Sequence, residues 1–204
     1  MAHSLVHVVD DDPAMRDSLG FLLDTAGFEV RLYAGGTQLL DGLRPPAQGC
    51  VLTDIRMPGI DGRELLRQLR AAGHELPVVM MTGHGDVPLA VEAMKLGACD
   101  FIEKPFDDEM LIQALRSALE LERGGPAEAI DPALGEFMRR VGTLSQRERQ
   151  VLDHLVAGEN SKAMGRALDI SPRTVEIYRA KLMAKTQATS LQELVRWAVL
   201  TKLA

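Results

Sequence analysis

Carboxylates recur at the ends of short apolar runs in this sequence, where they could bind a metal ion and attack phosphorus. Asp10 and Asp11 follow the apolar run 5–9, and Asp54 follows the run 50–53. Their oxygens would suit Mg²⁺, because this ion takes few protein carboxylates and keeps several waters. A carboxylate in such a pocket can also attack phosphorus and form an aspartyl phosphate. The three acids therefore predict a phosphoryl-transfer site with Mg²⁺ as its cofactor.

A hydroxyl and an ammonium group follow two further apolar runs. Thr82 follows the run 78–81, and Lys104 follows the run 101–103. Phosphoryl transfer needs groups that neutralise charge on the equatorial oxygens, and these two residues stand where such contacts are required. One acidic cluster alone is more often a helix cap or a solvated loop. Suitable groups after four separate runs favour a site over coincidence.

The apolar runs themselves predict how these groups come together. Short, continuous apolar runs are typical of buried strands in a parallel sheet. From residue 5 to about 122 they alternate with amphipathic helical stretches, which predicts an α/β fold, a doubly wound parallel sheet with helices on both faces. Ligands of such sheets bind beyond the carboxyl ends of the strands. The sheet would therefore bring the carboxylates, the hydroxyl and the ammonium group to one edge.

The second part of the chain differs in charge and in pattern. Residues 1–122 have a net charge of −10 and residues 123–204 one of +4, within a total of −6. This asymmetry favours metal or phosphoryl chemistry in the first part and a polyanionic partner for the second. A stretch with glycine and proline after residue 123 predicts a linker. The expected domains are 1–123, a linker at 124–138, and a small all-α domain at 139–204.

A helix-turn-helix motif is predicted inside the second domain. A short helix near 162–168 is followed, after about four residues, by a helix that Ser171 and Pro172 open and that ends near Lys185. Such a second helix can contact base edges and phosphates of DNA. A charged helix face is more often merely solvated, but the local basic excess favours DNA. The exposed residues that could make these contacts are Arg173, Thr174, Glu176, Arg179, Lys181 and Lys185.

The motifs of the first domain resemble the receiver domain of two-component response regulators. The resemblance extends over about the first 120 residues and comes from the segments 8–12, 54–58, 81–83 and 101–106. It implies a flavodoxin-like (CheY-like) fold in which a sensor histidine kinase phosphorylates Asp54.

Individual roles in the metal site also follow from this resemblance. It implies that Mg²⁺ is held by Asp11, Asp54 and the main-chain carbonyl of Arg56, with Asp10 assisting through water.

The resemblance further implies a conformational switch. Thr82 would hydrogen-bond the phosphoryl group, Lys104 would pair with it, and Phe101 would be the switch aromatic that turns inward. Val91 and Lys95, on the fourth expected helix, would belong to a dimer face that forms after phosphorylation.

The segments 144–152 and 170–179 resemble the LuxR-type helix-turn-helix domain, and the whole chain resembles regulators of the FixJ/NarL class. The segment 82–95 is most similar to the FixJ members of that class. The resemblance implies core positions for Val175 and Leu182. The DNA contacts that it implies come from Lys162, Arg173, Thr174, Arg179, Lys181 and Lys185. Its implied partners are a double-stranded DNA operator, a second copy of the chain, and RNA polymerase.

The expected function is control of transcription, in which phosphorylation of Asp54 switches dimerisation and sequence-specific DNA binding. The chain would then be no enzyme beyond its own phosphorylation and dephosphorylation. One alternative is a DNA-binding regulator whose receiver is a phosphorylation-independent interaction module. Another is an aspartate-nucleophile phosphatase, which is disfavoured because Asp10 and Asp11 are adjacent, whereas such enzymes space the two acids by one residue.

Composition places the protein in a broad class. Only two cysteines occur, Cys50 and Cys99, without the spacing of metal ligands, which favours reduced thiols in a cytosolic protein. No apolar run is long enough to cross a bilayer, and no membrane partner is expected. We therefore expect a cytoplasmic protein.

Overall fold

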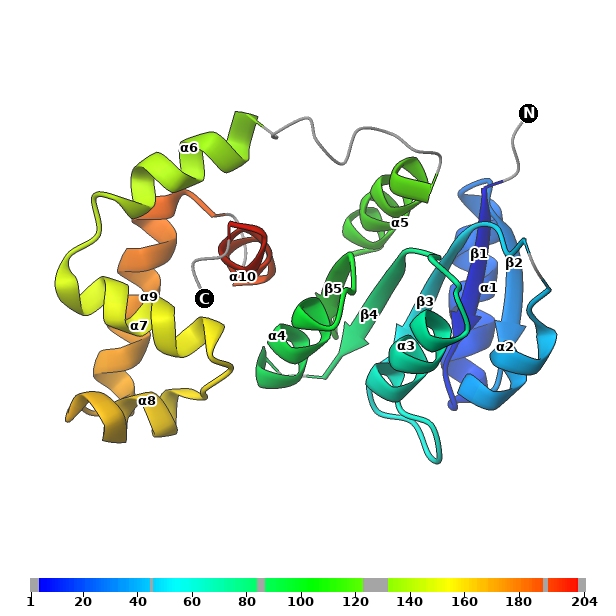
Figure 1. Cartoon of the computed structure of the whole chain (residues 1–204), viewed down its shortest axis with the longest axis horizontal. Helices are drawn as coiled ribbons and strands as arrows, with labels where there is room; N and C mark the ends of the chain where they lie inside the picture. The colour runs from blue at the N-terminus through cyan, green and yellow to red at the C-terminus, as the bar shows by residue number, and fades with distance from the viewer. Residues whose placement is uncertain (1–3, 45, 84–86, 123–131, 189–190, 202–204) are drawn as a thin grey trace. The chain divides into compact units, whose positions relative to one another are not determined.

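The structure is a computed structural model that describes residues 4–44, 46–83, 87–122, 132–188 and 191–201 (Figure 1). The chain divides into two compact units. The first consists of residues 1–84 and 96–126, and the second of residues 85–95 and 127–204.

The first unit contains a five-stranded parallel sheet with the strand order β2-β1-β3-β4-β5. This order confirms the predicted doubly wound sheet. The strands are β1 (Leu5–Val9), β2 (Glu29–Tyr33), β3 (Cys50–Asp54), β4 (Val78–Thr82) and β5 (Asp100–Glu103). The central strands β1, β3 and β4 are almost wholly buried, as expected for strands covered on both faces.

Helices cover both faces of this sheet (Figure 1). The helices of the first unit are α1 (Pro13–Thr25), α2 (Gly36–Gly42), α3 (Gly62–Ala71) and α5 (Asp108–Glu122). On one face, side chains of α1 and α5 form a single apolar core with alternate residues of β1, β3 and β4, among them Leu23, Leu52 and Leu115. Figure 1 shows α2 and α3 on the opposite face.

Strand register explains how distant residues reach one edge of the sheet. Val9 pairs with Thr53, so the residues after β1 and the end of β3 lie side by side. Thr82 pairs with Glu103, which places the residue after β5 beside the end of β4. The three acids, Thr82 and Lys104 therefore occupy the same edge of the sheet, as the sequence predicts.

The second unit is helical within the described residues. Its helices are α4 (Val87–Lys95), α6 (Pro132–Val141), α7 (Gln146–Val156), α8 (Ser161–Leu168), α9 (Pro172–Thr186) and α10 (Leu191–Leu200). Helix α6 begins inside the range 124–138 that the sequence predicts as a linker, because residues 132–138 are already helical. The earlier part of that range lies outside the described residues.

Local sequence explains where the helices of the second unit begin. Ser145 and Glu148 form a capping box at the start of α7, in which each side chain accepts from the other residue's backbone N–H. Ser171 caps α9, and Pro172 occupies its first turn. The residue types at 190–193 also predict a capping box, but its first residue, Ser190, lies outside the described residues. Phe137 of α6 and Trp197 of α10 pack with their ring centroids 5.2 Å apart and their planes tilted by 50°, which joins these two helices.

Candidate metal centre and nucleic-acid interface

Three carboxylates converge beyond the carboxyl ends of β1 and β3. Asp10, Asp11 and Asp54 each offer an oxygen, and these atoms lie within 4.8 Å of one another. Asp10 is buried, the Asp54 side chain is 16 % exposed, and Asp11 is exposed. Three hard oxygen donors in a site that is exposed to solvent at Asp11 fit Mg²⁺, because this ion keeps part of its water shell.

Hydrogen bonds within the loop after β1 hold Asp10 in place. One oxygen of its carboxylate accepts from the backbone N–H of Asp12, at 2.9 Å. Its carbonyl oxygen accepts from the guanidinium group of Arg16, in the first turns of α1, at 2.7 Å. Arg16 was not among the residues predicted from the sequence. Its contact fixes the backbone that presents two of the three acids.

The ammonium group of Lys104 joins the buried acid to the acid at the end of β3. Its Nζ atom donates to Asp54 Oδ2 at 2.8 Å and to Asp10 Oδ2 at 3.1 Å. Burial alone would lower the pKa of Lys104, but the hydrogen bond and charge of Asp54, and then those of Asp10, outweigh it and raise the pKa above its ordinary value. Lys104 is therefore a stable cation beside Asp54. The Lys104–Pro105 peptide bond is cis.

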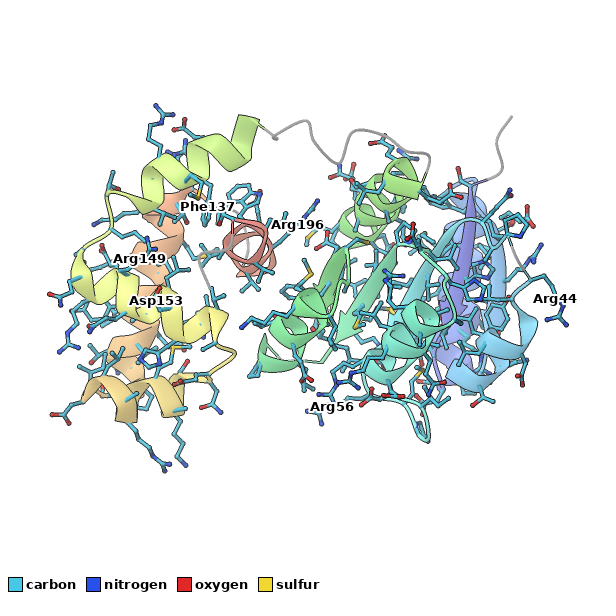
Figure 2. The ribbon with its side chains drawn as sticks, viewed as in Figure 1. Arg44, Arg56, Phe137, Arg149, Asp153 and Arg196 are labelled. Carbon is cyan, nitrogen blue, oxygen red and sulfur yellow. The ribbon has the colours of Figure 1, made fainter. Side chains whose placement is uncertain are left out.

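The remaining residues expected at the receiver site have distinct environments. Thr82 is buried, and its hydroxyl donates to the carbonyl oxygen of Ile102 at 3.4 Å. The Phe101 ring is buried, with 3 % of the residue exposed. The backbone N–H of Arg56 donates to Asp54 Oδ1 at 3.2 Å, while its side chain points outward (Figure 2).

The two residues expected on a dimer face differ in exposure. Both lie on α4, where Lys95 is exposed but Val91 is only 1 % exposed. Of this pair, only Lys95 presents its side chain on the surface in this structure.

A tight turn at residues 169–171 separates α8 and α9 in the second unit. Asp169 adopts the left-handed conformation, with a φ of 55°, and the backbone N–H of Ile170 donates to the carbonyl of Gly165. Val175 and Leu182 are fully buried, in agreement with their predicted core positions. The arrangement is the expected helix-turn-helix.

The residues predicted to contact DNA lie on the outer side of α8 and α9. Lys162, Arg173, Glu176, Lys181 and Lys185 are exposed, while Thr174 and Arg179 are half-buried. 

Two of these cations already form ion pairs within the protein. Arg179 bonds to Glu176, and Lys185 bonds to Glu148 of α7. Ile177 is 51 % exposed on α9 and was not predicted as a contact, although an apolar side chain on such a helix can touch a thymine methyl group.

Comparisons with known proteins also divide the chain into two parts, but they place α4 in the first part, with the sheet. The model of the response regulator receiver domain matches residues 6–116, and that of bacterial regulatory proteins of the LuxR family matches residues 142–198. The chain therefore belongs to the response regulators with a receiver domain and a LuxR-type DNA-binding domain, and it is a transcriptional regulator of FixJ-like type.

Individual relatives extend over nearly the whole chain. The transcriptional regulatory protein FixJ of Bradyrhizobium diazoefficiens is 53 % identical over 95 % of this chain and 94 % of that protein. FixJ of Rhizobium meliloti is 46 % identical over 98 % of this chain and 97 % of that protein. The crystal structure of full-length FixJ from B. japonicum, 50 % identical, matches all of both chains with a TM-score of 0.57. None of the helices among the described residues is long and apolar enough to span a membrane.

Proposed function

We propose that a sensor histidine kinase phosphorylates this regulator on Asp54 and that phosphorylation controls its dimerisation and its binding to a DNA operator. The observation that supports this proposal most directly is the position of Lys104. Its ammonium group contacts both Asp54 and Asp10, beside the three carboxylates that suit Mg²⁺. A fixed cation beside a partly exposed carboxylate is what transfer of a negatively charged phosphoryl group requires.

The reaction needs Asp54 as the nucleophile. A carboxylate oxygen of Asp54 attacks the phosphorus of the phosphohistidine, the P–N bond breaks, and its electron pair stays on the imidazole, which takes up a proton. Lys104 neutralises charge on the transferred oxygens. Asp10, Asp11 and Asp54 would hold Mg²⁺, which supplies further positive charge at the phosphoryl group when it is bound.

Thr82 could link phosphorylation of Asp54 to a change in the neighbouring strand. Its hydroxyl, which bonds to the main chain of β5 in this structure, lies at the end of the strand next to Asp54 and could turn toward a phosphoryl group. Breaking the bond to Ile102 would then couple phosphorylation to β5, where Phe101 is located. Phosphorylation changes the population of two states only if it stabilises one more than the other.

The proposed partners follow from these two sites. They are the kinase, double-stranded DNA and a second copy of the chain, with RNA polymerase as a further partner during transcription. We place the protein in the cytoplasm, since its DNA partner is there. We also propose that the chain turns over no external substrate and that its chemistry is confined to its own aspartyl phosphate.

The proposal can be tested with acetyl phosphate and Mg²⁺, reading intact mass and solution size together. We expect a phosphoryl adduct and a dimer for the wild type and for Asp12→Asn, since Asp12 lies in the same loop outside the carboxylate trio and asparagine also caps helices. We expect neither for Asp54→Asn, nor for the wild type after chelation of Mg²⁺. A wild type without an adduct would instead support the phosphorylation-independent alternative.

A further inference from the structure

Three side chains form a closed polar cluster on the outer side of the helix-turn-helix. Ser161 begins α8, and Glu176 and Arg179 lie three residues apart on α9. The guanidinium group of Arg179 donates to Glu176 Oε1 at 2.9 Å and to the Ser161 hydroxyl at 3.2 Å. The Ser161 hydroxyl in turn donates to the same Glu176 oxygen. The cluster thus fixes one oxygen of this carboxylate from two sides.

Exposure shows which member of the cluster is presented to a partner. The Glu176 side chain is 55 % exposed, whereas that of Arg179 is 24 % exposed. Among the residues that the structure describes, the second oxygen of Glu176 has no hydrogen-bond partner, and Nη1 of Arg179 donates to two acceptors within the protein. The outward-facing group is therefore an acceptor, held in place by a cation beneath it.

The position of Glu176 on α9 favours contact with bases over contact with phosphates. Residues three or four apart share one helix face, and Arg173, Glu176, Ile177 and Ala180 are all exposed along such a face. The first half of a recognition helix is the part that reaches base edges in the major groove. A carboxylate on this face is repelled by phosphates and by base acceptors. It can bond only to an amino group, and cytosine N4 is the donor that Glu characteristically recognises there.

We infer that Glu176 is a specificity-determining residue of α9, which accepts a hydrogen bond from the amino group of one cytosine in each half-site, and that Arg179 and Ser161 are positioning residues that hold its carboxylate. This inference rests on the proposed operator binding. It assigns Arg179 a role different from the direct DNA contact expected from the sequence. It also explains an acidic side chain on a surface that must approach a polyanion.

The test begins with phosphorylated full-length protein and a pool of random-sequence DNA duplexes. From the sequences that wild-type protein selects, the preference at each base pair is measured, and the measurement is repeated for Glu176→Ala. We expect the variant to lose about tenfold or more of the preference for C·G at one position per half-site. Its affinity for mixed-sequence DNA should be equal or higher, since a negative charge has been removed.

A matched control removes the same charge elsewhere in the domain. Asp153 of α7 has a side chain that is 53 % exposed and pairs with Arg149 at 3.5 Å (both labelled in Figure 2). Asp153→Asn should leave every base preference unchanged. An unchanged preference in Glu176→Ala as well would overturn the inference and leave operator binding intact. If wild-type protein selected no sequence at all, the proposed operator binding and this inference would both fail.

The roles of the positioning residues are separated by a double-mutant comparison. If Arg179 only holds the carboxylate, Arg179→Ala weakens the same C·G preference in the wild-type background and has no effect on it in the Glu176→Ala background. A phosphate contact would instead lower affinity for every sequence, and reduce its salt dependence, in both backgrounds. That second result would remove Arg179 from the positioning role.

Discussion

The ammonium group of Lys185 lies 2.6 Å from a carboxylate oxygen of Glu148 and so joins the last turn of α9 to the first turn of α7. The Glu148 side chain is only 6 % exposed, and the same oxygen accepts from the backbone N–H of Ser145 at 2.7 Å. The bond from Lys185, followed by that from Ser145, lowers the pKa of Glu148 to about 2. The placement of the recognition helix is thus coupled to the cap of α7.

We predict that Lys185→Ala destabilises the second unit by about 1–3 kcal/mol, because it leaves the carboxylate of Glu148 buried without its cation. Trp197 is the single tryptophan of the chain and lies in α10, so its fluorescence during urea unfolding reports this unit. Lys162→Ala is the control, since it removes the same charge from an exposed position on α8. Equal urea midpoints for the two variants would contradict a structural role for Lys185.

The same pair predicts a dependence of stability on acid. Because the folded pKa of Glu148 lies below its ordinary value of 4.5, the stabilisation is fully present above pH 4.5 and is lost as the pH falls from there toward about 2. The free energy of unfolding of the second unit should therefore decrease more steeply over this window in the wild type than in Glu148→Gln. Parallel slopes for the two proteins would show that the ion pair contributes no pH dependence.

Arg16 provides a prediction for the metal site. We predict that Arg16→Ala raises the Mg²⁺ concentration for half-maximal phosphorylation by acetyl phosphate about tenfold, because the backbone that presents Asp10 and Asp11 loses its anchor. Arg44 is a close control, since its guanidinium group also donates to main-chain carbonyls, those of Asp41 and Leu43 (Figure 2). Arg44→Ala should leave the Mg²⁺ dependence unchanged. A shift of the same size in both variants would contradict the anchoring role.

The sequence predicted the positions of the receiver-site residues because each one ends or follows an apolar run. In a parallel sheet, that position alone brings Asp54 and Lys104 to the same edge, without knowledge of any side-chain contact. The start of α9 was also predictable, since Ser171 and Pro172 are local signals. These features depend on residues that are neighbours in the chain or on the alternation of strands and helices.

The features that the sequence did not predict depend on contacts between residues far apart in the chain or on the direction in which a side chain points. Lys185 and Glu148 are 37 residues apart, and no local pattern relates them. The position of Arg16 on α1 would accept many polar residues, so the sequence does not single it out. Its role becomes visible only from the hydrogen bond between its guanidinium group and the carbonyl oxygen of Asp10. For Gly165, helix propensity alone favours alanine by about 1 kcal/mol, whereas the close approach of the Ile170 carbonyl favours glycine.

His7 predicts a pH dependence of the first unit. It is 2 % exposed, with its Nδ1 3.1 Å from the Tyr33 hydroxyl and its Nε2 3.1 Å from the carbonyl oxygen of Gln48. A carbonyl only accepts, so Nε2 carries the hydrogen and Nδ1 accepts from Tyr33. Burial lowers the pKa of His7, an effect that the bond to Gln48 opposes only in part.

The direction of the effect follows from this lowered pKa. The unfolded chain binds a proton on His7 more readily than the folded one, so the stabilisation is present above pH 6.5 and is lost as the pH falls below it. We expect the free energy of unfolding of the sheet domain, measured by circular dichroism, to fall more between pH 7 and pH 5 in the wild type than in His7→Gln. An equal fall in both proteins would mean that His7 adds nothing to the acid sensitivity.

Gly165 gives the sharpest test of how the helix-turn-helix is packed. A Cβ atom at this buried position of α8 would lie 2.8 Å from the carbonyl oxygen of Ile170 and 3.4 Å from the backbone nitrogen of Pro172. Both neighbours are backbone atoms, one in the turn and one at the start of α9, so they can move only if α9 moves with them. We predict that Gly165→Ala destabilises the second unit by about 1–3 kcal/mol and weakens operator binding.

Gly135 of α6 offers the opposite case within the same unit. It is exposed and helical, and a Cβ atom there would have nothing within 4 Å. Gly135→Ala should therefore stabilise the unit by about 0.5–1 kcal/mol, since alanine loses less backbone entropy in a helix than glycine does. Urea unfolding followed by Trp197 fluorescence should shift in opposite directions for the two variants. If both variants raised the urea midpoint, helix propensity would outweigh packing at Gly165. The close approach between α8 and the turn would then not determine the position of α9.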